Sequence, residues 1–329
     1  MKILASNSLS DYELLDSGDG KRLERFGKFV LVRPDPQIIW KPKLAKSKWQ
    51  KADAIYSTSS PNSPKSPNIR GIWKRVKNIP EKWVINYQDI SFQIKLSPFK
   101  HTGVFPEQAV HWEWINELIQ KRLQRGDSKR GAPLSPRSAS EEVEWGCELA
   151  GPRLDQPNIL NLFGYTGIAS LVAAKAGAKV THVDGSYPTI GWARENQKLS
   201  NLEGKPIRWI LDDCLKFVQR ELKRGVKYDG ILMDPPIYGH GPKGEVWDFN
   251  KNFPELLDIC TQLLSPNPLF VIVNAYAISS SSLMLENILK DFVGSLGGQI
   301  ESGELALKES SGNRLLSTGI FARWTKYLI

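Results

Sequence analysis

The sequence predicts an α/β fold with a doubly wound parallel sheet, and three features of one stretch carry that prediction. Residues 158–163 form a short apolar run, which is typical of a strand buried on both faces of a parallel sheet. Gly164 and Gly167 follow this run and allow the backbone to turn sharply. Residues 168–176 carry an alanine-rich helical stripe, and residues 179–183 form a second apolar run. This order predicts a β-α-β unit.

The same alternation of strands and helices continues toward the end of the chain. Apolar runs predict further strands at residues 207–210, 229–233 and 269–273, with a helical pattern after each. Residues 304–307 and 315–324 predict a closing antiparallel hairpin. We therefore expect five parallel strands and a hairpin at one edge, which makes a Rossmann-like sheet of seven strands.

The end of the second predicted strand indicates which kind of ligand the unit binds. Asp184 lies there, 17 residues past Gly167, and an acid in this place can accept hydrogen bonds from two ribose hydroxyls. The Gly-x-x-Gly turn lacks the third glycine of the dinucleotide fingerprint, which disfavours NAD. A nucleoside ligand without a pyrophosphate fits both facts, and S-adenosylmethionine is a common ligand of that kind.

The composition is typical of a soluble globular protein. The chain has 329 residues, 41% of them hydrophobic and 24% charged, and its length allows about two domains. No apolar run approaches the roughly 18 residues of a membrane helix, and the first residues lack the apolar core of a signal peptide. Cys147, Cys214 and Cys260 are odd in number and widely separated, which disfavours a disulfide framework. We expect a cytoplasmic protein with no metal site and no membrane contact; the sequence does not indicate its oligomeric state.

The positive charge of the chain is concentrated near its start. The formal net charge is +9, and residues 1–100 contain 19 Lys and Arg against 9 Asp and Glu, so this segment accounts for the whole excess. Four tryptophans lie among these charges. A basic segment with interleaved aromatic residues favours RNA as a partner over a merely solvated basic surface. The tryptophans are Trp40, Trp49, Trp73 and Trp83.

These patterns divide the chain into three parts. Residues 1–75 read as a β-rich basic module that binds RNA, with a loop rich in Ser and Pro at 57–68. Residues 76–145 read as a connecting β-hairpin and helix, with a disordered loop at 126–140. Residues 146–329 form the domain that binds the cofactor.

Four polar motifs follow four successive strands of the predicted sheet. Ligands of open α/β sheets bind at the carboxyl ends of the strands, where these motifs would meet. Each acid could also be an ordinary turn former or helix cap, but four such motifs at successive strand ends favour a single site. The motifs are Gly164-Tyr165-Thr166-Gly167, Asp184, Asp212-Asp213 and Asp234-Pro235-Pro236.

Each motif suggests a role in binding an adenosyl cofactor and an acceptor. Asp184 would bind the ribose hydroxyls, and Asp213 with the amide of Cys214 would bind the edge of the adenine. The prolines after Asp234 fix the backbone, so this segment would form a rigid rim between the sulfonium methyl group and the acceptor.

Residues 158–240 resemble the class I S-adenosylmethionine-dependent methyltransferases, and specifically the large-subunit ribosomal RNA methyltransferases of the I and K/L type. With an upstream turn and a closing segment included, the resemblance covers residues of about 80 to 329. As a set these motifs are specific, whereas Asp-Pro-Pro alone would be weak. They are Asn161-Leu162-Phe163-Gly164-Tyr165-Thr166-Gly167, Val183-Asp184-Gly185-Ser186, Asp212-Asp213, Asp234-Pro235-Pro236-Ile237-Tyr238, Gly103-Val104-Phe105-Pro106-Glu107-Gln108 and Phe321-Ala322-Arg323-Trp324.

The resemblance implies a seven-stranded methyltransferase sheet, S-adenosylmethionine as the cofactor and RNA, in particular ribosomal RNA, as the substrate. It also implies a set of residues for each part of the site. The catalytic set is Asp234, Pro235, Pro236 and Tyr238. The cofactor-binding set is Asn161, Phe163, Gly164, Tyr165, Thr166, Gly167, Asp184, Ser186, Asp212, Asp213, Cys214, Phe105 and Gln108.

Two departures from the family pattern narrow the reaction. Members that methylate carbon 5 of cytosine need a cysteine nucleophile after the fifth strand, and residues 271–276 contain none. Ile237 stands where an aromatic residue would follow the two prolines, so Tyr238 would have to stack on the base. We therefore expect direct transfer to a nitrogen of an RNA base. The alternatives are a methyltransferase of a small molecule or protein, a cofactor-binding protein without catalysis, and an NAD oxidoreductase.

Overall fold

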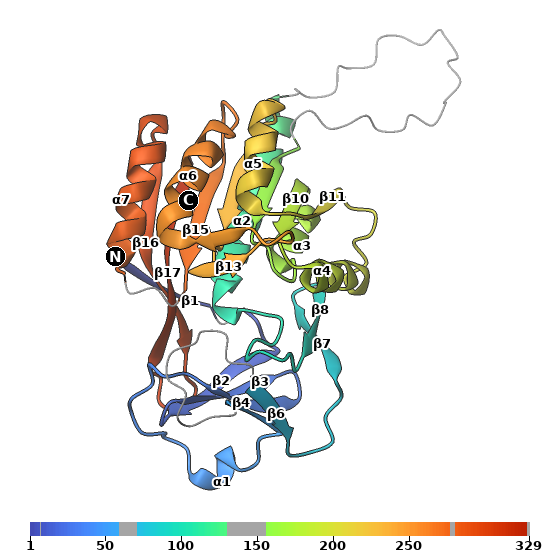
Figure 1. Cartoon of the computed structure of the whole chain (residues 1–329), viewed down its shortest axis with the longest axis vertical. Helices are drawn as coiled ribbons and strands as arrows, with labels where there is room; N and C mark the ends of the chain where they lie inside the picture. Colours follow the sequence, from blue (N-terminus) through green and yellow to red (C-terminus); the bar gives the residue numbers. More distant parts are fainter. Residues whose placement is uncertain (7, 59–70, 130–155, 277–279, 328–329) are drawn as a thin grey trace, which may run out of the picture.

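The computed structural model describes residues 1–6, 8–58, 71–129, 156–276 and 280–327. Figure 1 shows a large sheet flanked by helices, with a smaller β-rich module below it that carries β2, β3, β4, β6 and α1. Within the described residues, no helix has both the length and the apolar content that crossing a membrane requires.

The large sheet confirms the predicted fold class and contains one strand more than predicted. Five strands run parallel, β17 is antiparallel to β15 and β16, and β1 pairs in parallel with β16. The additional strand is β1, which lies at the edge of the sheet. It can pair with β16 because Gly303 has no side chain, and a side chain at Gly303 would collide with the backbone of Lys2. In spatial order the strands are β1 (Lys2–Ala5), β16 (Gln299–Lys308), β17 (Leu315–Thr325), β15 (Phe270–Ala275), β12 (Gly230–Met233), β9 (Asn158–Leu162), β10 (Lys179–Asp184) and β11 (Ile207–Leu211).

Helices cover both faces of this sheet because successive residues of each buried strand point to opposite faces. In β12, Ile231 and Met233 pack into the core on the side of α5, α6 and α7. Leu232, between them, packs on the opposite side against the cluster of α2 and α3. The helices are α2 (Ala109–Lys129), α3 (Ile168–Lys175), α4 (Tyr187–Leu199), α5 (Cys214–Lys223), α6 (Phe249–Gln262) and α7 (Ser282–Val293).

The first residues of both loops predicted from composition belong to regular elements. Residues 126–129 are the last turn of α2, although the sequence predicted a disordered loop at 126–140. A single Gly126 lowers helix propensity but does not end a helix that is already fixed by packing over several turns. Likewise residues 57 and 58 of the loop predicted at 57–68 belong to β5, because they pair with β6. Residues 59–68 and 130–140 lie outside the described residues.

The β-rich module contains a five-stranded sheet in the order β2-β3-β4-β5-β6. Its last strand, β6, lies at the edge, and a short helix, α1, precedes β5. A separate hairpin, β7-β8, connects the module to α4 and the large sheet. The bounds are β2 (Tyr12–Gly18), β3 (Lys21–Phe26), β4 (Phe29–Pro34), α1 (Lys46–Trp49), β5 (Ala54–Thr58), β6 (Gly71–Arg75), β7 (Lys82–Tyr87), β8 (Ile90–Lys95), with η1 (Pro106–Gln108), β13 (Tyr238–His240), β14 (Val246–Asp248) and η2 (Gly294–Leu296) elsewhere.

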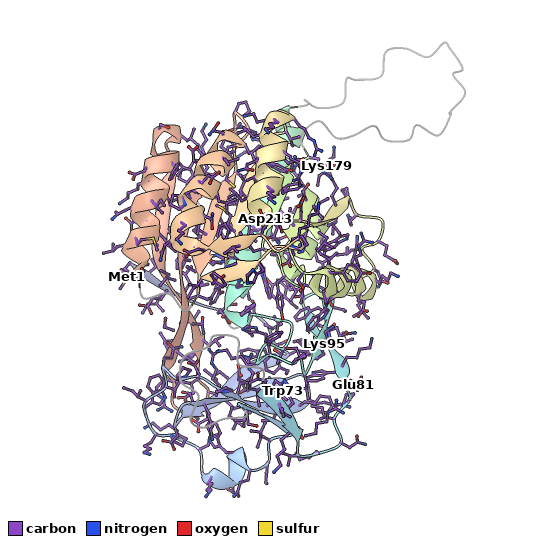
Figure 2. The ribbon with its side chains drawn as sticks, in the orientation of Figure 1. Met1, Trp73, Glu81, Lys95, Lys179 and Asp213 are labelled. Carbon is purple, nitrogen blue, oxygen red and sulfur yellow. The ribbon has the colours of Figure 1, made fainter. Side chains whose placement is uncertain are left out.

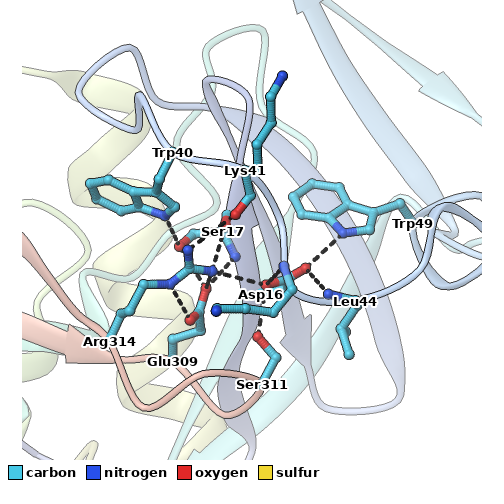
Figure 3. Close-up of polar contacts among 10 residues, drawn as sticks. Asp16, Ser17, Trp40, Lys41, Leu44, Trp49, Glu309, Ser311 and Arg314 are labelled. Atoms are coloured by element: carbon cyan, nitrogen blue, oxygen red, sulfur yellow. Dashed lines mark hydrogen bonds and ion pairs between the residues drawn. The ribbon is translucent and has the colours of Figure 1, made fainter.

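A buried ionic network fastens the module to the turn of the β16-β17 hairpin (Figure 3). Asp16 of β2 and Glu309 of the turn are both fully buried. Glu309 accepts hydrogen bonds from the amide and the hydroxyl of Ser17, each at 2.7 Å, and forms an ion pair with Arg314 at 2.7 Å. Asp16 accepts from the hydroxyl of Ser311 at 2.7 Å. Asp16 also accepts from the amides of Lys43 and Leu44 within the module. The bonds from Ser17 to Glu309 and from Ser311 to Asp16 form only when module and hairpin meet.

The module also holds the segment that leads toward the carboxyl ends of the parallel strands. Arg33 donates to the carbonyl of Lys100 at 3.1 Å, and Trp73 donates through Nε1 to the carbonyl of Ser97 at 2.8 Å. Figure 2 shows Lys95 between the module and the sheet, where its ammonium lies 3.8 Å from the centroid of the Trp192 ring. The module thus positions the backbone immediately before η1.

Removing one member of the buried network should destabilise the protein. Glu309→Ala removes the nearer of the two carboxylates that pair with Arg314 and leaves the buried amide and hydroxyl of Ser17 without their acceptor, so we expect a loss of about 3 kcal/mol in the free energy of unfolding, measured by urea denaturation. The control is Lys41→Ala, which removes an exposed ion pair with Asp19 and should change stability by less than about 1 kcal/mol. Equal unfolding midpoints for the two variants would contradict the prediction.

Candidate functional site

The turn after β9 has a backbone shape that few residues adopt. Phe163 and Tyr165 have positive φ angles of 56° and 50°, and Gly167 has a φ of 82°. Non-glycine residues in this region carry strain of about 1–3 kcal/mol, which is typical of ligand-binding turns. Gly164 lies against the ring of His182, so no side chain fits there. The turn therefore brings backbone, rather than side chains, close to the space above the sheet.

Asp184, at the end of β10, fixes this turn from the neighbouring strand. Its Oδ2 accepts from the amide of Tyr165 and its Oδ1 from the amide of Ser186, both at 2.9 Å. Burial raises the pKa of Asp184 to about 6, although the two amide hydrogen bonds lower it. Each oxygen keeps a further lone pair, so the carboxylate can still accept from a pair of hydroxyl groups.

The acids after β11 have partners within α5. Asp212 forms an ion pair with Arg220, and Asp213 caps the helix by accepting from the amide of Lys216 at 2.9 Å. Cys214 is buried, and burial raises the pKa of its thiol well above the ordinary value. The tip of the β13-β14 hairpin lies close by, because a side chain at Gly241 would contact Asp213. The hairpin therefore covers this part of the strand ends.

Asp234, after β12, has one paired and one unpaired oxygen. Its Oδ2 accepts from Nε2 of Gln108 at 2.7 Å, whereas its Oδ1 is buried without a hydrogen-bond partner. The same Nε2 donates to the hydroxyl of Tyr276 at 3.1 Å. Burial raises the pKa of Asp234 to about 7, the carboxyl group of Glu107 raises it further, and the Gln108 hydrogen bond lowers it. An unpaired buried carboxylate oxygen is costly, and a donor from a ligand would satisfy it.

The residues after Asp234 are held by the following hairpin. The carbonyl of Pro236 accepts from Nε1 of Trp247 at 2.7 Å, and the carbonyl of Ile237 accepts from the amide of Phe249 at 2.9 Å. Tyr238 is 50% exposed and contacts His240 edge to face, with ring centroids 5.3 Å apart. The rim is therefore rigid, and its tyrosine ring faces outward.

One cavity brings together part of the predicted set. Asp234 shares it with the turn after β9 and with residues from the segment before α2. The other predicted residues do not line the cavity: Gly167, Asp184, Ser186, Asp212, Asp213, Cys214, Pro235, Pro236 and Tyr238. Asp184 is nevertheless linked to the cavity wall, because it accepts a hydrogen bond from the amide of Tyr165. The lining residues are Val104, Phe105, Gln108, Trp112, Asn161, Phe163, Gly164, Tyr165, Thr166, Ile168, Ala169, Leu232 and Asp234.

Hydrogen bonds join the cavity walls that come from distant parts of the sequence. Thr166 donates from Oγ1 to the carbonyl of Gly103 at 2.7 Å, which ties the glycine turn to the segment before η1. Asn161 donates to the hydroxyl of Ser170 at 2.9 Å and so orders the first turn of α3. The cavity is thus built on several elements at once.

Sequence reasoning missed two groups beside Asp234. Glu107 is buried and raises the pKa of Asp234, and it stands in the motif that ends in Gln108. Tyr276 follows β15, which is the fifth parallel strand, so its place at a strand end was the available signal. The residue types Glu and Tyr alone do not identify either position as part of a functional site.

Solved structures of similar proteins share this fold. A SAM-dependent methyltransferase from Agrobacterium tumefaciens is 39% identical, with a TM-score of 0.84 over 99% of this chain and 94% of that chain. A protein from Streptococcus mutans, assigned as a SAM-dependent methyltransferase, is 19% identical with a TM-score of 0.62 over 97% of this chain and 76% of that chain. The second likeness concerns the fold alone. No protein-family model matches the chain.

The curated relatives match a smaller part of the chain. The ribosomal RNA large subunit methyltransferase K/L of Shewanella frigidimarina is 40% identical over 122 residues, which are 36% of this chain and 17% of that protein. The K/L enzyme of Shewanella oneidensis is likewise 40% identical over 128 residues, 18% of its length. This chain therefore spans less than a fifth of these relatives.

A doubly wound sheet with a Gly-x-x-Gly turn after its first strand and an acid after its second defines the class of adenosyl-binding α/β enzymes. Because the Agrobacterium enzyme is 39% identical over nearly its whole length, the chain belongs to the S-adenosylmethionine-dependent methyltransferases. S-adenosylmethionine is thus its cofactor. The site fits this ligand, since a turn with no side chain at Gly164 and a carboxylate with free lone pairs at Asp184 lie at one sheet edge.

The absence of a side chain at Gly164 should be essential for cofactor binding. Gly164→Ala forces a methyl group against His182 and Asn161, and overpacking of this kind costs about 1–3 kcal/mol, so we expect calorimetry to show a loss of affinity for S-adenosylmethionine of roughly tenfold or more. The control is Gly191→Ala in α4, where an added Cβ meets nothing within 4 Å. Unchanged affinity in the first variant would remove the turn from the binding site.

Proposed function

We propose that the protein transfers the methyl group of S-adenosylmethionine directly to a nitrogen atom of an RNA base. The observation that carries this proposal is Asp234 Oδ1, a buried acceptor without a partner beside the cofactor turn. An amino group that enters the cavity would donate to this oxygen. The hydrogen bond would hold the nitrogen lone pair toward the methyl group and polarise the N–H bond. The N–C bond would form as the sulfur–methyl bond breaks, the cofactor would leave as the neutral thioether, and the proton lost by the amino group would pass to the Asp234 carboxylate and then to water.

The cofactor supplies an electrophilic methyl group on a sulfonium, and the protein supplies position and charge. Asp184 would bind the ribose hydroxyls and Asp213 the adenine edge, with the turn from Phe163 to Gly167 around the amino-acid part. Pro235 and Pro236 would keep Asp234 in place, as the Trp247 hydrogen bond indicates. Tyr238, half exposed next to this rim, would stack on the incoming base.

The cysteines argue for nitrogen rather than carbon as the target. Methylation of a pyrimidine carbon requires a thiolate that adds to the base. Among the described residues, Cys214 and Cys260 are both buried, and burial raises the pKa of each thiol, so neither is a nucleophile. A nitrogen with its own lone pair needs no such intermediate.

RNA is the proposed substrate because two independent features favour it. The matched relatives are named ribosomal RNA large subunit methyltransferases, although the match covers only part of them. The module carries exposed cations along its edge strand and its short helix, which can bind phosphates. These residues are Lys46 and Lys48 of α1, Lys74 and Arg75 of β6, and Lys77. With RNA as substrate, we also propose a cytoplasmic location.

Removal of the Asp234 carboxylate should stop the reaction without preventing cofactor binding. We expect Asp234→Ala to lower methyl transfer from labelled S-adenosylmethionine to total RNA by at least about 100-fold, because the acceptor nitrogen loses its oriented partner. Calorimetry should show cofactor affinity close to that of the native protein. The control is Asp258→Asn, which changes an exposed acid of α6 and should retain full turnover. Equal turnover in Asp234→Ala would exclude Asp234 from the reaction.

Reversal of charge on β6 should weaken RNA binding and make the binding less dependent on salt concentration. For Lys74→Glu with Arg75→Glu we expect RNA affinity to fall and the slope of log K against log salt to decrease by about 1 for each lost phosphate contact. Lys205→Glu, which changes an exposed lysine before β11, should leave the slope unchanged. If turnover and slope persist in the double variant, the module does not bind the substrate, and a small molecule or a protein becomes the better candidate.

A further inference from the structure

Tyr276 is held firmly at the end of β15, beside Asp234. Phe105 lies on one side of its ring, with centroids 5.4 Å apart. Gly319 of β17 lies on the other, where an added Cβ would be 2.8 Å from Cδ1 and 2.9 Å from Cε1 of the tyrosine. Only glycine at this position leaves room for the ring. The geometry therefore fixes where the hydroxyl group points.

A β-bulge next to Gly319 supports this placement. Leu305 pairs with Gly319 while Ala306 pairs with Ser317, so Thr318 is an extra residue on β17. Its hydroxyl donates to the carbonyl of Leu305 at 3.0 Å. Bulges of this kind bend a strand and redirect side chains next to active sites. The bulge and the glycine together shape the edge of β17 around Tyr276.

Gln108 links Tyr276 to Asp234 through a single amino group. A carboxamide has two N–H donors, and Nε2 of Gln108 donates to Oδ2 of Asp234 at 2.7 Å and to the hydroxyl of Tyr276 at 3.1 Å. The tyrosine accepts in this bond, so its own proton is left to donate, and it donates to no other group among the described residues. Asp234 Oδ1 is left to accept. One amide therefore holds a free donor and a free acceptor side by side.

We propose that Tyr276 and Asp234 together read one edge of the acceptor base, with Gln108 as the residue that positions both. This proposal rests on the proposed function and specifies its substrate. The acceptor oxygen suits an exocyclic amino group, and the tyrosine proton suits an unprotonated ring nitrogen next to it. Adenine, cytosine and the N2–N3 edge of guanine have this pair, whereas uracil has no amino group. The tyrosine bond occupies the ring nitrogen, so the methyl group goes to the amino nitrogen.

The two residues should respond to pH in different ways. The titratable groups that face Asp234 are Glu107 of η1 and Tyr276 of β15, while Gln108 is neutral. Asp234 accepts as a carboxylate, so activity should rise with pH through its pKa of about 7. The hydrogen bond from Gln108 lowers that pKa, so its removal should move the rise to higher pH. Burial raises the pKa of Tyr276 well above its ordinary value, and the hydroxyl stays protonated throughout.

The test compares the native protein with Tyr276→Phe and Gln108→Met by kcat/KM as a function of pH, with RNA that lacks this modification as substrate. For Tyr276→Phe we expect a loss of roughly 10- to 100-fold at every pH and no shift of the profile. For Gln108→Met we expect a comparable loss and a shift of the acid limb to higher pH. Tyr327→Phe, which changes a tyrosine two residues after the end of β17 whose hydroxyl accepts from Arg122, is the matched control and should keep full activity.

Mass spectrometry of the modified nucleoside identifies the methylated atom. A methyl group on an exocyclic nitrogen of adenine, cytosine or guanine supports the proposal. A product methylated on a carbon, on uracil or on N7 of guanine overturns it, and so does full activity of Tyr276→Phe. Methylation of RNA would stand in those cases as the function of the protein. If the native protein labels no RNA, both the proposed function and this inference fall.

Discussion

The site depends on a buried ionic contact between two parts of the chain that are far apart in sequence. Asp16 and Glu309 are fully buried, and Arg314 and Ser311 reach them from the hairpin turn. Such contacts add little net stability over an apolar core, but the bonds that cross from module to hairpin, such as those from Ser17 to Glu309, form in only one arrangement. They therefore set the orientation of the module over the strand ends, and the module in turn holds residues 97–100 and the segment before Gln108.

The electrostatics of the site follow from that arrangement. Asp234, Glu107 and Asp184 lie at one end of the sheet, and burial raises the pKa of each. In the proposed site, the fold would keep these acids out of water beside a ligand that carries a positive sulfonium. A cationic ligand stabilises buried carboxylates, so burial and cofactor charge complement each other. The positive φ angles of Phe163 and Tyr165 add backbone strain to this region, which is typical of ligand-binding turns.

Much of the fold was predictable because it follows from local patterns. Apolar runs, helical stripes and glycine turns mark the five parallel strands, and Asp184 and Asp234 stand directly after two of them. Partners across long separations were not predictable. Tyr276 contacts Gly319 and Gln108, and β1 pairs with β16, but no periodic pattern in the sequence indicates these contacts. The ion pair of Asp212 with Arg220, eight residues further on, was not predicted either. Tyr238, expected at the site from its motif, is half exposed on the β13-β14 hairpin, and its role as the stacking residue stays a prediction.

The pairing of β1 with β16 has a consequence for how the chain is made. Lys2–Ala5 pairs with Gly303–Ala306, so these partners leave the ribosome about 300 residues apart. During most of translation the backbone N–H and C=O groups of β1 therefore have no partner strand and are exposed to water. The module likewise lacks its contact with Glu309 until the last hairpin is made. Assembly of the sheet edge and anchoring of the module become late, linked events. A nascent chain halted before the last hairpin would have a nearly complete central sheet without the contact that aligns its β-rich module.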